Sequence, residues 1–173
     1  MGKFKEIFPQ SCIWRLAILI LVLLGTNPYS FFRLAEAADE YAAKSGEEIF
    51  IQTGYTKYSP INAKFKDFLC KQEIMNKISK ADIIVTQGGF GAIADCLRAG
   101  KKVVAVPRKP ELKESPDYQE ELVKELEKLG RLKGVYNINQ LAKIIEEAKK
   151  EKFKKGNEHR ISELVNNFIA VNS

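Results

Sequence analysis

The chain has 173 residues, of which 45% are hydrophobic and 29% charged, a balance typical of one folded domain and not of a disordered or fibrous chain. Twenty-eight basic residues against 22 acidic ones give a net charge of +6, which suits a phosphate ligand, a nucleic acid or an acidic membrane surface without choosing among them. Three separated cysteines and a single histidine argue against a disulfide framework, a metal site and a Ser-His-Asp triad.

An apolar run, LAILILVLL at residues 16–24, is the first predicted element. A membrane span needs about 20 apolar residues, and a secretory signal would be followed by small residues at a cleavage site, which this run lacks. A strand buried on both faces of a parallel sheet has this composition. We therefore predict a buried strand, preceded by a basic and aromatic arm at residues 1–15. Such an arm suits either a membrane interface or a loose chain end, and both interpretations stay open.

Helical and strand patterns alternate along the rest of the chain. Helices are expected at residues 31–45, 71–79, 92–99, 115–129, 138–149 and 158–171. Strands are expected at residues 48–52, 65–68, 81–86, 102–106 and 134–136. The alternation predicts an α/β, Rossmann-like domain at residues 16–156, with a parallel sheet covered by helices on both faces, followed by a C-terminal helix at residues 157–173. The lysine-rich stretch 149–155 is interpreted as a solvated hinge before that helix.

A glycine-rich segment, Gln87-Gly88-Gly89-Phe90-Gly91, lies between a predicted strand and a predicted helix. Ligands of parallel sheets bind beside the carboxyl ends of the strands, where glycines allow close approach and a helix start offers free N–H groups. We expect a phosphate site here, the alternative being a tight turn that only packs the helix against the strand. Asp95, one turn into the helix, could bind a ribose diol or complement the helix dipole.

Other candidates lie in the remaining loops at the same edge of the predicted sheet. Gln119, in the first turn of the helix expected from Ser115 and Pro116, could hold a sugar hydroxyl or a phosphate. Residues 89–94 also fit the G-x-G-x-x-A dinucleotide fingerprint, with Arg108 as the cation of an NADP site. That interpretation is weakened by position, because the fingerprint belongs after the first strand of such a sheet.

Five short motifs follow one another along residues 18–149. They are Gly25-Thr26-Asn27-Pro28 with Phe32-Arg33-Leu34, Ile51-Gln52-Thr53-Gly54, the glycine-rich segment, Leu97 to Arg108, and Asp117-Tyr118-Gln119. In this order they resemble the donor-binding subunits of bipartite glycosyltransferases and the C-terminal domain of glycosyltransferase family 28. Relatives include the catalytic subunit of the dolichol-linked N-acetylglucosaminyltransferase and bacterial exopolysaccharide enzymes of the PssE and EpsE type.

The resemblance implies the C-terminal half of a GT-B fold that binds a UDP-sugar. Gly89 and Gly91 would cradle the diphosphate, Asp95 would bind the ribose, and Gln119 would reach the donor sugar or the phosphates. The other implied site residues are Gly25 and Thr26, which would line the crevice between the halves, Asn27, Gln87, Gly88 and Phe90 from the same motifs, and Arg108, which would stabilise departing UDP. No cofactor, metal or nucleic acid is implied.

The resemblance also implies an inverting hexosyltransferase that is active with a membrane-anchored, PssD- or EpsD-like subunit. That partner would bind a lipid-linked sugar acceptor at the cytoplasmic face of the membrane, and the catalytic base could belong to it. Three histidines of the family pattern are replaced, by Asn27, Gln87 and Tyr118. A catalytically silent nucleotide-sugar-binding subunit is therefore the first alternative, and an NADP-dependent oxidoreductase domain is the second.

Overall fold

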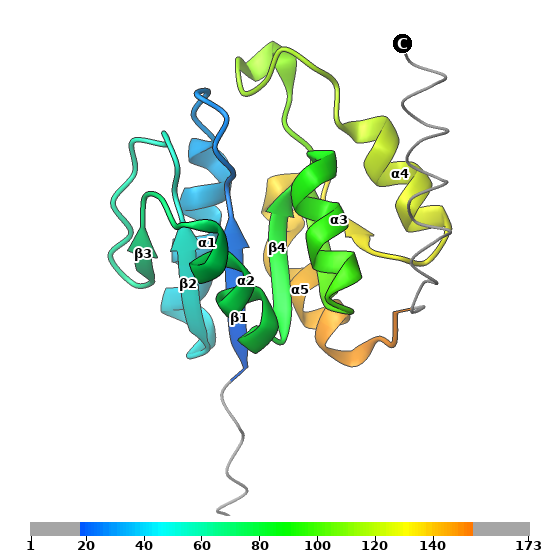
Figure 1. Ribbon diagram of the computed structural model, residues 1–173, viewed down its shortest axis with the longest axis horizontal. Coiled ribbons are helices and arrows are strands. Elements are labelled where there is room, and N and C mark those ends of the chain that lie inside the picture. Colours follow the sequence, from blue (N-terminus) through cyan, green and yellow to red (C-terminus); the bar gives the residue numbers. More distant parts are fainter. Residues whose placement is uncertain (1–17, 154–173) are drawn as a thin grey trace, which may run out of the picture.

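A computed structural model describes residues 18–153 and shows one six-stranded parallel sheet with helices on both faces (Figure 1). The strand order is β3-β2-β1-β4-β5-β6, and every neighbouring pair is parallel. The strands are β1 (Leu19–Leu23), β2 (Glu48–Gln52), β3 (Lys64–Lys66), β4 (Ile83–Gln87), β5 (Lys102–Val106) and β6 (Lys133–Gly134). The predicted α/β, Rossmann-like class is confirmed.

Two helices cover one face of the sheet and three cover the other. The helices α1 (Phe32–Ser45) and α5 (Leu141–Lys150) enclose one core cluster; α2 (Lys71–Lys80), α3 (Phe90–Arg98) and α4 (Glu120–Lys128) enclose the second. Two short 3-10 helices, η1 (Pro110–Leu112) and η2 (Ile138–Gln140), lie in the connections. The two clusters explain why the central strand β1 is apolar at every position and why β4 and β5 are apolar over most of their length.

The apolar run near the start of the chain forms the central strand β1. Ile20 and Val22 face the α1 and α5 cluster, while Leu21 and Leu23 face the opposite cluster, and all four side chains are buried. The prediction of a buried strand is therefore confirmed. In the part of the chain that the structure describes, no helix is long and apolar enough to span a bilayer.

Local signals misplaced two helix starts. The helix expected from Ser115 begins at Glu120, because residues 107–119 fold as an irregular loop in which Ser115 Oγ accepts only a local bond from the N–H of Asp117. The helix expected from Ala92 begins at Phe90, so Gly91 lies within its first turn. The expected strand at 65–68 is β3, shifted to Lys64–Lys66.

The prediction of a solvated hinge at residues 149–155 is wrong for its first residue, Lys149, which is helical and has a largely buried side chain. Lys149 lies in the last turn of α5 with its side chain only 7% exposed. Its Nζ lies 2.8 Å from Glu47 Oε1 and 2.7 Å from Glu146 Oε1, so the charge is paired within the fold. The arm at residues 1–15 and the helix expected at 158–171 lie outside the described residues.

Two consecutive lysines close the amino edge of the sheet, on both faces. Lys101 Nζ donates to the carbonyl oxygens of Ser79 and Ala81, at the end of α2. Lys102 Nζ donates to those of Ala148 and Lys149, at the end of α5. Because helix C-termini leave carbonyls unpaired and carry partial negative charge, these cations stabilise both helix ends.

A buried carboxylate fixes the long β2–β3 connection against α1. Asp39 is 2% exposed and accepts main-chain hydrogen bonds from residues 61, 62 and 63, as well as one from the hydroxyl of Tyr58. Burial raises the pKa of Asp39, but these hydrogen bonds outweigh it and hold the pKa below the ordinary value.

We expect Asp39→Asn to lower the free energy of unfolding by about 2 kcal/mol at neutral pH, because an amide cannot accept on both side-chain atoms. Since the folded pKa is lowered, the carboxylate stabilises the protein above the unfolded pKa of about 3.9 and loses this effect as pH falls through the folded value. Urea unfolding at several pH values measures both. Exposed Asp117→Asn is the control, and a deficit that persists unchanged at the most acidic pH would contradict the explanation.

Candidate functional site

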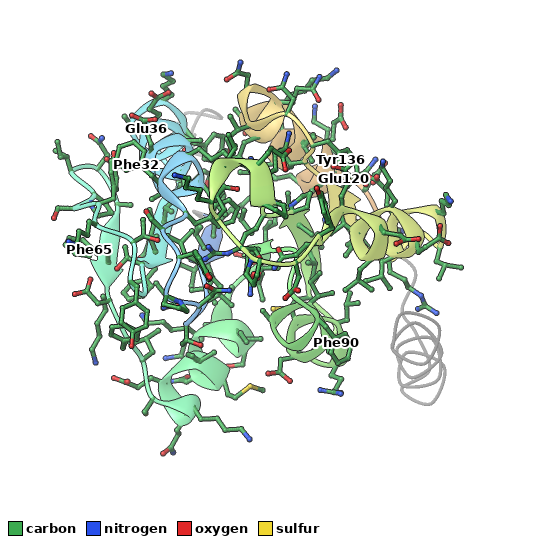
Figure 2. The ribbon with its side chains drawn as sticks, turned by 90° about the horizontal axis from the view of Figure 1, so that it is seen from above. Phe32, Glu36, Phe65, Phe90, Glu120 and Tyr136 are labelled. Carbon is green, nitrogen blue, oxygen red and sulfur yellow. The ribbon has the colours of Figure 1, made fainter. Side chains whose placement is uncertain are left out.

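Four loops meet at the carboxyl edge of the sheet, which is seen from above in Figure 2. They are residues 24–31 after β1, 53–63 after β2, 88–89 after β4 and 107–119 after β5. Most of the candidate residues from the sequence lie on these loops, while Phe90, Gly91 and Asp95 lie on α3. Ligands of parallel α/β sheets bind at such an edge, beside the point where neighbouring crossovers diverge.

Arg108 lies beneath these loops and not in an open crevice. The residue is 2% exposed, and its guanidinium lies 4.5 Å from the centroid of the Phe31 ring. Its Nη1 donates to the carbonyl oxygens of Tyr29 and Glu114 at 2.9 and 2.6 Å. Its Nη2 donates to that of Leu24 at 2.7 Å. One buried cation thus joins the loop after β1, at two points, to the loop before α4.

The inward position of Arg108 changes its expected role. Burial lowers the pKa of its guanidinium to about 10, which leaves the group charged at neutral pH. Because its Nη atoms donate to main-chain carbonyls, this arrangement does not present the cation to departing UDP or to an NADP phosphate. The contact with departing UDP that the sequence suggested is therefore corrected to a structural one.

An ion pair that was not expected from the sequence joins the loop 107–119 to helix α1. Arg33 Nε and Nη2 donate to the two carboxylate oxygens of Glu114 at 2.7 and 3.0 Å, a bidentate geometry. Glu114 also accepts from the main-chain N–H of Lys109, and Arg33 donates to the carbonyl of Pro107. Glu114 stands among charged residues in KPELKES, so its burial has no local sequence signal.

Gln52, the glutamine of the Q-T-G motif and the last residue of β2, joins the loop after β1 to the segment after β3. Its Oε1 accepts from the N–H of Gly25, and its Nε2 donates to the carbonyls of Gly25 and Asp67. Gly54 approaches so closely that an added Cβ would lie 2.2 Å from the carbonyl oxygen of Gly25. Sequence analysis placed Gln52 in a motif but assigned it no role.

Gln87 and Gln119 join the other two loops. Gln119 is the residue before α4, and its Nε2 donates to Gln87 Oε1 at 2.9 Å. Its Oε1 accepts from the main-chain N–H of Arg108 at 3.1 Å. Gln87 Nε2 also packs against two glycines: a Cβ added at Gly25 would lie 3.0 Å from it, and one added at Gly89 would lie 2.5 Å from it. Gln119 therefore lies beside the glycine-rich segment, at the start of a helix that begins at Glu120 and not at Ser115, and its expected contact with the donor stays a prediction.

The three glycines have different environments. An added Cβ at Gly88 would lie 3.0 Å from the main chain of Pro107, so this position requires glycine for packing. Gly89 is the N-cap of α3, and Gly91, in its first turn, has nothing within 4 Å of an added Cβ. Among the described residues, none accepts a hydrogen bond from the N–H groups of Phe90, Gly91 or Ala92. Open backbone with free donors is the geometry that favours an anion.

The remaining candidates lie at the margin of this geometry. Asp95 is exposed on α3, with its carboxylate 3.0 Å from Arg98 Nη1. Thr26 is exposed, and Asn27 Oδ1 accepts from the N–H of Tyr29 in a local turn. Phe90 packs partly against the α2, α3 and α4 cluster and appears beside α3 in Figure 2. The structure brings Gly25, Gln87, Gly89 and Gln119 together, while Asp95 stands apart from that group.

Comparison with known proteins gives one family match. Residues 19–169 match the family described as Glycosyltransferase family 28 C-terminal domain. No curated protein sequence matches the chain.

Several solved structures share the fold. A glycotransferase of kitacinnamycin aligns with a TM-score of 0.61 at 19% identity, over 95% of this chain and 42% of that one. MurG of Acinetobacter baumannii aligns with a TM-score of 0.53 at 19% identity, over 84% and 49%. ALG13, solved by NMR, aligns with a TM-score of 0.58 at 15% identity, over 86% and 94%. The chain thus spans less than half the length of the first two proteins.

We expect Arg108→Met to lower the free energy of unfolding by about 3 kcal/mol or more, because three main-chain carbonyls lose their donor in a buried site. Urea denaturation measures the change. Arg98→Met removes the same side chain from an exposed position and should cost about 0.5 kcal/mol or less. Equal losses in the two variants would show that the buried guanidinium does not hold the loops together.

Proposed function

The chain belongs to the glycosyltransferase family 28 C-terminal domain family, and from this premise we propose that it binds a UDP-sugar at the carboxyl edge of its sheet and supplies the donor half of a glycosyltransferase. The sugar proposed is N-acetylglucosamine or a related hexose. The single observation that carries the proposal is the start of α3, where three free N–H groups and the open Gly91 backbone lie together.

The diphosphate would lie at the start of α3. The nine residues of this helix direct a partial positive charge toward its N-terminus, in addition to the hydrogen bonds of the free N–H groups. Glycine at 91 allows a phosphate oxygen to approach the main chain more closely than any side chain would permit. The replacement of a family histidine by Gln87 leaves this backbone cradle intact, because the cradle uses main-chain groups.

The glutamines would bind the sugar side of the donor. Gln87 Nε2 donates to no described residue, so it is a free donor beside Gly25 and Gly89. Gln119 Nε2 already donates to Gln87 Oε1, and a hydroxyl placed between the two amides could replace that bond. Asp95 would bind the ribose hydroxyls. To do so, its carboxylate would give up the solvent-exposed ion pair with Arg98, which contributes little to stability.

A second polypeptide would supply the acceptor half. The structural likeness to ALG13 supports a two-component arrangement. We propose a membrane-anchored, PssD- or EpsD-like partner and a lipid-linked sugar acceptor at the cytoplasmic membrane face, in polysaccharide or glycan assembly. In an inverting transfer the acceptor oxygen bonds to the anomeric carbon as the bond to UDP breaks, and a base takes the hydroxyl proton. We assign that base to the partner.

Gly91→Ala separates binding from stability. Alanine at an open helical position should raise the free energy of unfolding by about 0.5 to 1 kcal/mol, because glycine is the poorer helix former. The same methyl group should weaken UDP binding about tenfold or more, by obstructing approach to the main chain. Calorimetric titration with UDP and thermal unfolding measure the two effects. A stabilised variant that binds UDP as tightly as the parent would exclude the α3 cradle.

The nucleotide itself is tested by titrating the parent chain with UDP, UDP-N-acetylglucosamine and NADP. Binding to the folded form raises the unfolding midpoint in proportion to affinity, so we expect a shift with the uridine nucleotides. A shift with NADP alone would favour the oxidoreductase alternative.

Transfer of labelled sugar to a polyprenyl-diphosphate acceptor, with the candidate partner co-expressed, tests turnover. We expect Gln119→Ala and Asp95→Ala each to reduce kcat/KM about tenfold or more, since each loses a hydrogen bond to the donor. Glu125→Ala, exposed on α4, is the control. UDP-sugar binding without any transfer would indicate the silent regulatory subunit instead.

A further inference from the structure

One face of the sheet is only partly covered near its outer strands. The β2–β3 connection, residues 53–63, contains no helix, so α2 is the helix that lies beside β2 and β3 on that face (Figure 1). A groove of about 470 Å³ runs between α2 and these strands. Apolar side chains of Leu19, Leu21 and Phe50 line it, and Lys64, Lys77 and Lys80 stand around it.

The segment that borders this groove is strongly basic. Residues 64–80 contain five lysines, no arginine and two acidic residues, a net charge of +3. Glu73 pairs with Lys66, and Asp67 accepts a hydrogen bond from Thr53. Lys71 and Lys80 are exposed and have no acidic partner among the described residues. Lys64 is paired with Glu48, so the lysines of this segment without an acidic partner within residues 18–153 are Lys71, Lys77 and Lys80. The segment still has an excess of positive charge for an external anion.

Apolar side chains are exposed between these lysines. Phe68 and Met75 are 45% and 40% exposed, and Phe68 contacts the exposed ring of Tyr55 edge-on at 5.0 Å. Lys77 Nζ lies 3.3 Å from the centroid of the Phe50 ring, so its charge rests on the face of an aromatic ring in the floor of the groove. We call the surface formed by Lys64, Lys66, Phe68, Lys71, Met75, Lys77 and Lys80 the lysine flank.

We propose that the lysine flank binds the surface of an anionic lipid bilayer. Lysine is depleted at protein interfaces, whereas each lysine near an acidic membrane contributes attraction without any requirement for a fixed partner geometry. Aromatic and long apolar side chains insert at the headgroup boundary, which suits Phe68 and Met75. The flank runs along β3 and α2, from Phe68 beside the loop 53–63 to Lys80 at the end of α2. It contains no residue of the start of α3 or of the loops after β1, β4 and β5, so these need not be covered when the flank binds the membrane.

The test uses the full chain and vesicles of phosphatidylcholine, alone or mixed with phosphatidylserine, in a sedimentation assay. The triple variant Lys64→Gln, Lys71→Gln, Lys80→Gln removes three flank charges. Its matched control, Lys128→Gln, Lys143→Gln, Lys150→Gln, removes three exposed charges from α4 and α5, so both variants have a net charge of +3. At about fivefold per lysine, the flank variant should bind mixed vesicles roughly a hundredfold more weakly than the parent.

We expect the control triple variant to bind mixed vesicles within about threefold of the parent. In the parent chain, hydrogen exchange of residues 64–80 should slow when these vesicles are added. Met75→Gln should weaken binding severalfold at unchanged charge, since it removes an inserting side chain. Equal binding of the two triples, or a parent chain that ignores anionic vesicles, would overturn the proposal. Loss of binding to a co-purified partner protein in the flank triple, with vesicle binding unchanged, would overturn it in favour of a protein-docking surface. UDP binding is measured in parallel, and its presence or absence bears on the donor site alone.

Discussion

The carboxyl edge of this domain depends on one buried cation. The guanidinium of Arg108 supplies hydrogen-bond donors to carbonyls at the end of β1, in the loop before α1 and in the loop before α4. Those carbonyls point into a region that water does not reach, so without the cation they would be unpaired at considerable cost. A cation–π contact with the ring of Phe31 also stabilises this charge. This contact fixes the loop after β1 against the loop 107–119.

Around that cation the loops are held by neutral amides. Gln52 joins the loop after β1 to the segment after β3, and Gln87 with Gln119 joins the loops after β4 and β5. Both sets of hydrogen bonds place no negative charge at the start of α3. Glu114, the buried acidic residue of this loop, is directed to Arg33 and to the N–H of Lys109. The edge therefore keeps a positive potential from helix N–H groups, which suits a diphosphate.

Sequence patterns predicted the parts of the fold that depend on local chemistry. The helix at 32–45 ends at Gly46 in the left-handed conformation, and β2 and β5 have the predicted bounds. The loop 107–119 was mispredicted because Ser115 and Pro116 resemble a helix start, whereas the ion pair between Arg33 and Glu114, 81 residues apart, determines its course. The sequence placed the glycine-rich segment and Gln119 at the carboxyl edge of the sheet, where the structure also has them. A sequence pattern does not distinguish a buried arginine after a strand from an exposed one, and Arg108 was therefore interpreted as a ligand contact.

The amino edge has a different construction, with consequences for how such domains diverge. Lys101 and Lys102 terminate helices on opposite faces of the sheet through main-chain carbonyls, contacts that do not depend on which side chains those helices carry. The sheet and its helices are thus held together at the edge opposite the proposed donor site. An exchange of histidine for glutamine, or a longer loop, at the carboxyl edge would leave these main-chain contacts in place, so a change of ligand specificity there need not disturb the scaffold.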